Sequence, residues 1–171
     1  MQFDELRFLA QQAALDLVGR RGRPVPPTVV LPGPERTVLL GLPDLPDADE
    51  ARHAVLAEVA AERVTAAGVP CWGFVAEADV AGQDGVVVVY GARRHAPEVT
   101  AAHFTPEGDL DVFVRAEPLD PTALPFLHPL QHAVDGLPGV GDAFAELDPK
   151  RAGLPDVPGR PDGPGGLPLH P

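Results

Sequence analysis

The chain has 171 residues, of which 44% are hydrophobic, and a formal net charge of −12. This length suffices to bury one core, while the acidic charge repels phosphate backbones and anionic lipid headgroups, so we expect neither nucleic-acid nor membrane partners. The sequence contains no Ser, Asn or Ile, which excludes a serine nucleophile.

A single cysteine, Cys71, cannot form a disulfide within the chain. The first residues, from Met1 to Glu5, lack the basic and apolar regions of a secretory signal. No run approaches the ~20 consecutive apolar residues of a membrane-spanning helix. We therefore expect a soluble cytoplasmic protein.

Residues 3–18 carry apolar side chains at helical spacing, which predicts an amphipathic helix. Gly19 follows as the expected helix stop. Arg20, Arg21 and Arg23 come next. Cations are favourable there because the C-terminus is the negative end of the helix dipole. We interpret these arginines as a solvated helix end rather than an anion site.

Two β-rich runs, 28–31 and 37–40, flank a stretch of turn-forming residues, which predicts a β-hairpin. Prolines on both sides of the first run predict that this strand lies at an edge of the sheet.

A second helix is predicted from Asp47 to Ala67. Asp47 and Glu50 have the spacing of a capping box, and Gly68 supplies the C-terminal stop. Because the apolar residues of this helix are small, we expect it to pack closely against a sheet.

Four further strands are predicted, at Cys71–Val80, Gly85–Arg93, Glu98–Phe104 and Leu110–Arg115. The run Gly85–Tyr90 has no polar alternation, which is typical of an interior strand covered at least partly on both faces. We expect this strand at the centre of the sheet.

Residues 105–109 suit a short hairpin loop, with Pro106 at the first turn position and Gly108 at the left-handed one. The resulting register pairs Phe104 with Leu110 and places His103 opposite Asp111.

The element order α-β-β-α-β-β-β-β, followed by short helices at Pro129–Val134 and Asp142–Leu147, predicts an α+β fold. We expect a mainly antiparallel sheet of five to six strands with the helices on one face. A single domain spans 1–136, with its core in 3–115. Residues 137–171 form a Pro/Gly-rich tail, for which we expect flexibility or use as a docking peptide.

Arg93, Arg94 and His95 end the predicted central strand, and with His103 they form the candidate site for an anionic ligand. The planar guanidinium of Arg suits carboxylate and phosphate groups. The site requires all four side chains to converge in one pocket. The alternative interpretation is that these side chains are charged only because the end of a strand leaves the core.

Other chemical groups favour structural interpretations. His128 and His132 have the spacing of a metal half-site, but no third ligand is indicated, and we expect no metal and no cofactor. Glu77 and Asp79 fit a solvent face better than an acid–base pair. Cys71 is interpreted as a buried, inert thiol, and no catalytic residue is predicted.

An acidic domain with few catalytic groups favours a non-enzymatic protein-interaction or scaffold module that binds a protein partner or forms a homodimer. The contact is expected through the sheet face carrying Trp72 and Phe74, or through an edge strand. The alternative is a small enzyme or binding domain for an anionic metabolite, acting through Arg93–His95 and His103.

The element order resembles the profilin-like and Roadblock arrangement and that of small acidic secretion chaperones, which are commonly dimeric scaffolds. Phe3–Leu6, the entry into the hairpin at Gly22–Leu31 and the hairpin at Glu77–Val89 also resemble small bacterial proteins of unknown function. This second resemblance covers residues 3–115. It implies the fold and provides no activity, ligand or site residue.

Overall fold

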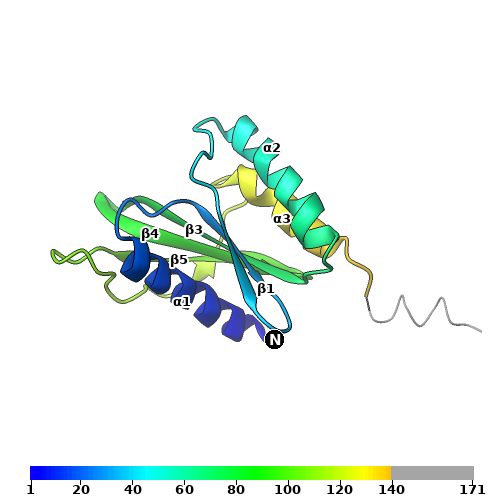
Figure 1. Cartoon of the computed structure of the whole chain (residues 1–171), viewed down its shortest axis with the longest axis horizontal. Coiled ribbons are helices and arrows are strands. Elements are labelled where there is room, and N and C mark those ends of the chain that lie inside the picture. Colours follow the sequence, from blue (N-terminus) through cyan, green and yellow to red (C-terminus); the bar gives the residue numbers. More distant parts are fainter. Residues whose placement is uncertain (140–171) are drawn as a thin grey trace, which may run out of the picture. The chain divides into compact units, whose positions relative to one another are not determined.

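The computed structural model describes residues 1–139, and within them three α-helices accompany a six-stranded antiparallel sheet (Figure 1). The predicted α+β class and element order are confirmed. Residues Met1–Leu137 form one compact unit. The predicted helix at Asp142–Leu147 and the tail from residue 140 onward lie outside the described residues.

The elements are α1 (Phe3–Arg21), β1 (Thr28–Pro32), β2 (Thr37–Gly41), α2 (Asp49–Val59), β3 (Cys71–Val80), β4 (Gln83–Ala92), β5 (His95–His103), β6 (Glu117–Pro118) and α3 (His128–Asp135).

The strands lie in the order β2-β1-β3-β4-β5-β6. The predicted β1–β2 hairpin is present, with Val30 opposite Leu39, and β4 is an interior strand as expected. The prediction that β1 lies at an edge is wrong, because Thr28 and Val30 also pair with β3. The prolines near β1 leave its pairing with β3 intact, and the strand at the open edge is β2.

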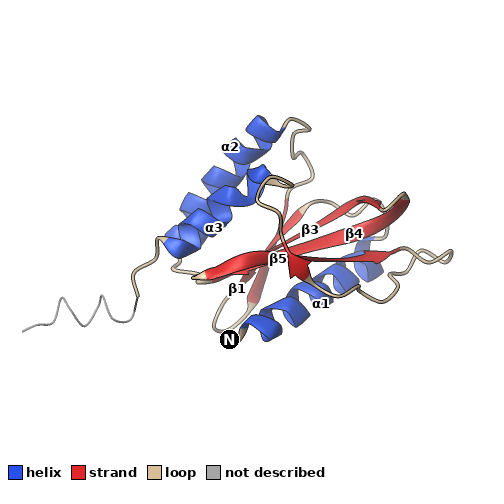
Figure 2. Cartoon of the chain, turned by 180° about the vertical axis from the view of Figure 1, so that it is seen from behind, coloured by secondary structure: helices blue, strands red, loops and turns tan. Residues whose placement is uncertain are grey.

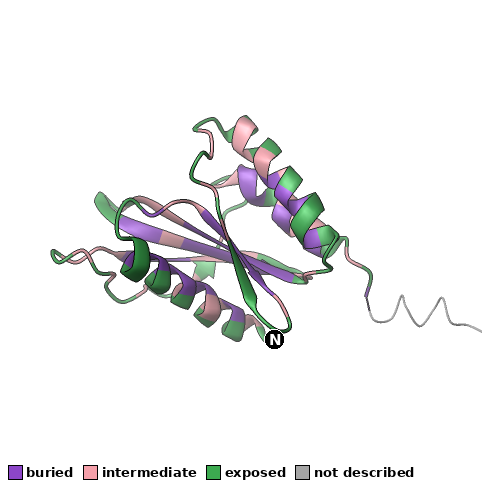
Figure 3. Cartoon of the chain, in the orientation of Figure 1, coloured by how far each residue is buried: buried purple, intermediate pink, exposed green. Residues whose placement is uncertain are grey.

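Helices cover both faces of the sheet, with α1 on one side and α2 and α3 on the other (Figures 1 and 3). The expectation of helices on one face is therefore wrong. Strand β4 explains the difference: Val88 and Tyr90 pack into the core beneath α1, whereas Val89 packs into the core beneath α2 and α3. A strand whose successive side chains are all apolar needs cover on both faces.

Helix α1 continues past Gly19 to Arg21 and is capped by Gly22. Gly22 has a φ of 65° and its N–H donates to the Val18 carbonyl at 2.9 Å. This positive φ favours glycine, and the bond satisfies a carbonyl of the last turn. Gly19 remains helical, so the first glycine after the apolar stripe did not mark the end.

Helix α2 begins at Asp49 after Ala48, and no side chain caps it, so the predicted capping box at Asp47 is wrong. The helix continues as a π-helical segment, Ala60–Thr65. Gly68 then ends it with a φ of 64°, as predicted. Figure 2 shows α2 beside α3 on the same face of the sheet.

The segment after β5 follows the predicted register only at its start. Phe104 pairs with Leu110, and the Asp111 N–H donates to the His103 carbonyl at 2.9 Å. Residues 110–115 do not form the predicted strand. Leu110 and Phe113 pack against the core beneath α1, whereas Val112 and Val114 are exposed. The ladder resumes only at β6.

Candidate functional site

Trp72 and Phe74, the predicted interaction face, lie in the core. They are 0% and 3% exposed. The Trp72 indole N–H donates to the Gln131 side-chain oxygen at 3.1 Å, and the Phe74 ring meets Phe126 edge-on with 5.8 Å between centroids. Because α2 and α3 cover this face, it offers no surface to a partner, and the prediction is corrected.

The four predicted anion-binding residues do not converge. Arg93, Arg94 and His95 lie at the β4–β5 turn, whereas His103 lies at the other end of β5. His95 and His103 are eight positions apart along the strand, a span of about 27 Å. His95 stacks on Phe3 with 5.0 Å between ring centroids, and the Arg94 N–H donates to Asp135 at 2.9 Å. The described residues therefore contain no single pocket built from these four side chains.

The histidine pair of α3 shares a groove with a third histidine. His128 and His132 line it together with His53 of α2, and its volume is about 450 Å³. The His128 Nε2 lies 2.9 Å from the Pro121 carbonyl oxygen, and the three side chains are exposed. Across residues 1–139, no group of three His, Cys, Asp or Glu side chains is arranged to hold a metal ion.

Cys71 is buried as predicted, whereas Glu77 lies in an ion pair with Arg23, its side chain 21% exposed, rather than on a solvent face. Cys71 is buried, and desolvation raises the pKa of its thiol, which disfavours the nucleophilic thiolate. The Glu77 carboxylate accepts hydrogen bonds from the Arg23 Nε and the Val25 N–H, both at 3.0 Å. The hydrogen bond from Arg23 lowers the pKa of Glu77. Both groups thus belong to the framework of the fold.

The edge strand β2 is largely open to solvent. Val38 and Leu39 are 42% and 44% exposed, and only Leu40 packs partly against the core beneath α2. No residue of Thr37–Gly41 is charged. The strand thus presents apolar side chains on both faces of the sheet edge.

The backbone of β2 has hydrogen-bonding groups that point away from the sheet. The Leu42 N–H donates to the Pro27 carbonyl at 2.7 Å, and the Arg36 carbonyl accepts from Gly33 at 3.0 Å. In an antiparallel pair, residues that hydrogen-bond to the neighbouring strand alternate with residues that do not. The even-numbered residues from Arg36 to Leu42 therefore direct their backbone groups toward β1. The N–H and carbonyl groups of Thr37, Leu39 and Gly41 therefore point outward, beyond the last strand of the sheet.

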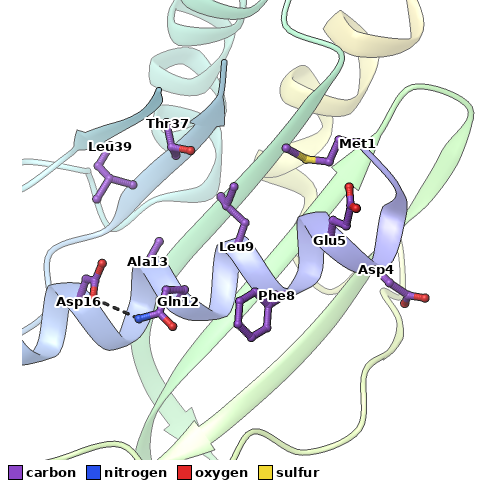
Figure 4. A pocket seen from close by; sticks show the side chains of 10 residues that line it. All are labelled: Met1, Asp4, Glu5, Phe8, Leu9, Gln12, Ala13, Asp16, Thr37 and Leu39. Carbon is purple, nitrogen blue, oxygen red and sulfur yellow. Dashed lines mark hydrogen bonds between the residues drawn. The ribbon is translucent and has the colours of Figure 1, made fainter. Parts of the chain in front are cut away.

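A groove of about 680 Å³ runs between α1 and β2. Figure 4 shows Leu9 and Ala13 on the side of α1 that faces Thr37 and Leu39. The exposed side chains of Met1 and Phe8 also line the groove. Asp4, Glu5 and Asp16 add carboxylates to this apolar lining.

The sequence offered a partial signal for this surface. It predicted the strand at 37–40, and in the predicted helix Phe8 lies outside the apolar stripe, as an exposed aromatic would. It could not show that Leu39 faces α1, because this depends on which strand pairs with which.

No family model, curated protein sequence or solved structure matches this chain. The likeness to small bacterial proteins and to Roadblock-type scaffolds therefore stays a prediction. None of the helices in residues 1–139 has the length and apolar character needed to span a bilayer.

Proposed function

We propose that this domain is a non-enzymatic protein-interaction module that binds an extended segment of protein along β2. The segment adds to the sheet as a further strand and exchanges hydrogen bonds with Thr37, Leu39 and Gly41. The observation that carries the proposal is the coincidence, in one edge strand, of outward-pointing backbone groups and exposed, uncharged side chains.

The two ends of the sheet differ in the way that this proposal requires. Sheet edges are usually protected by charge, proline or short length, because an open edge pairs with other chains. The edge strand β6 has only two residues, Glu117 and Pro118, and so combines all three protections. β2 has five residues without a charge or an internal proline. One edge is thus blocked and the other left open.

The groove beside β2 supplies side-chain selectivity. In an added strand, alternate side chains point to the face covered by α1. These side chains enter the apolar groove beside Leu39 and Phe8, while basic residues of the segment meet Asp4 and Asp16 at its margin. Backbone pairing therefore contributes affinity and the groove contributes preference for apolar side chains.

Selection from a library of random displayed peptides on the full-length protein tests this proposal. We expect enriched peptides with alternating apolar residues, and at least a tenfold loss of their affinity for Leu39→Lys, because a charge on the strand opposes pairing. Val112→Lys is the matched control, since Val112 is 83% exposed and does not line the groove. Enriched peptides that bind Leu39→Lys as tightly as the unmodified chain would place binding elsewhere.

A further inference from the structure

We propose that the segment which occupies β2 is the β2 strand of a second copy of this chain. Two copies then form a symmetric dimer in which their sheets become continuous through antiparallel β2–β2 pairing. This inference rests on the proposed function, because it names the partner of the same edge.

The outward-pointing residues define the register of this pairing. With the two-fold axis at Leu39, Leu39 pairs with Leu39 of the second copy, and Thr37 pairs with Gly41 in both directions. Each of these residues directs its N–H and carbonyl outward. Each pair can therefore exchange two hydrogen bonds.

Neighbouring registers satisfy fewer backbone groups. A register centred on Val38 pairs Gly41 with Glu35, which lies in the hairpin turn outside the strand. A register centred on Leu40 pairs Thr37 with Pro43, and proline has no N–H to donate. Only the register centred on Leu39 keeps all three outward residues paired with strand residues of the other copy.

The charges and side chains along the strand are compatible with a second copy. In this register Arg36 lies opposite Leu42, so no like charges are paired although both copies are acidic. Val38 lies opposite Leu40 on one face, and the two Leu39 side chains meet on the face of α1, beside both grooves. Cross-strand apolar pairs of this kind stabilise sheets.

The size and charge of the dimer predict how it behaves. Five-residue strands bury less than the ~1,000 Å² of a stable interface, so we expect a dissociation constant in the micromolar range. Each copy carries a net charge of −12. Because salt screens this repulsion, dimerisation should strengthen as ionic strength rises. A basic partner at the same edge would show the opposite dependence.

Sedimentation equilibrium of the full-length protein over micromolar to millimolar concentrations provides the first test. We expect the average mass to rise from 17.9 kDa toward twice that value, and to rise at lower concentration in high salt. Leu39→Lys should stay monomeric over this range, because two lysines would meet at the axis. Val112→Lys should dimerise like the unmodified chain. A monomer at all concentrations, or equal dimerisation of Leu39→Lys, would overturn the proposal.

Disulfide cross-linking tests the register. In the proposed dimer the Leu39 Cα atoms are about 5.5 Å apart, within the range of a disulfide, whereas those of Thr37 are about 14 Å apart. Mild oxidation should therefore link Leu39→Cys at least tenfold faster than Thr37→Cys. The unmodified chain controls for buried Cys71. Equal rates for the two variants would overturn the register.

These outcomes separate the two proposals. If the protein stays monomeric while selected peptides bind the unmodified chain and not Leu39→Lys, β2 is a docking edge for another protein and the self-pairing is wrong. If peptides bind Leu39→Lys unchanged, the docking edge itself is wrong.

Discussion

The Glu77 carboxylate holds the segment before β1 against the sheet, through hydrogen bonds from Arg23 and from the Val25 backbone. Arg23 also bonds to Asp84 at 3.0 Å and lies over the Phe104 ring, 4.0 Å from its centroid. The sequence presented Glu77 only as one of two carboxylates on a strand. Its partner is 54 positions away, so spacing along the chain could not reveal this ion pair.

Replacement of this carboxylate gives a prediction with a defined pH dependence. Because the folded state lowers the pKa of Glu77 below its ordinary value of 4.5, its contribution to stability is present above that value. The contribution is lost as pH falls through the lower pKa of the folded state. We expect Glu77→Gln to lower Tm by about 2–4 °C at neutral pH, the effect of ~1 kcal/mol.

Thermal unfolding followed by circular dichroism from about pH 7 to about pH 3 measures this difference. The gap between Glu77→Gln and the unmodified chain should close toward the acid end. Asp84→Asn is the matched control, because it removes the other carboxylate partner of Arg23. The Asp84 side chain is 70% exposed, so the effect of this substitution on Tm should be smaller. A gap that persists unchanged at the lowest pH would show that the charge of Glu77 does not matter.

Helix α3 is fixed to the sheet at Gly91 of β4. A Cβ atom there would lie 2.8 Å from the Trp72 indole nitrogen, and would also meet the Gln131 side-chain oxygen that accepts from that indole. We expect Gly91→Ala to cost about 1–3 kcal/mol of unfolding free energy through overpacking. Because Trp72 is the one tryptophan, its fluorescence should shift to the red if α3 is displaced.

Gly19→Ala is the control for this substitution. Gly19 is helical and has no atom within 4 Å of an added Cβ, so alanine should raise the free energy of unfolding by ~0.5–1 kcal/mol. Urea unfolding of both variants measures the two effects. A Gly91→Ala protein as stable as the unmodified chain, with unchanged fluorescence, would contradict close packing of α3 on β4.

The sequence predicted helices and turns whose signal lies in neighbouring residues. It did not predict where each strand lies in the sheet. The apolar stripes of α1 and α2 and the turn between Phe104 and Leu110 depend on neighbours in sequence. The position of β1 inside the sheet depends on pairing with β3, 43 or more positions away. The apolar run of β4 did indicate cover on both faces, and this signal conflicts with helices gathered on one face. The same long-range pairing leaves β2 at the edge and creates the candidate site.

At the scale of the whole molecule, the acidic surface and the open edge have opposite effects on association. A long, apolar, unpaired edge promotes association with other chains, including aggregation. A net charge of −12 on each copy opposes close approach of many copies. The uncharged strand is therefore tolerable in a chain whose remaining surface is strongly acidic, and its pairing should remain weak and reversible.

Within residues 1–139, the buried members of the two core clusters run from Leu6 to Val134, so we expect the described part to fold without the residues that follow it. We expect a chain ended after Gly139 to keep its Tm within about 2 °C of the full-length protein, since every buried side chain of the two clusters is retained. It should also self-associate with the same dissociation constant, because β2 lies in the retained part. Differential scanning calorimetry and sedimentation equilibrium measure these quantities on both chains. A Tm lower by ten degrees or more would mean that residues 140–171 contribute to stability, and weaker association at unchanged Tm would mean that they contribute to the dimer interface.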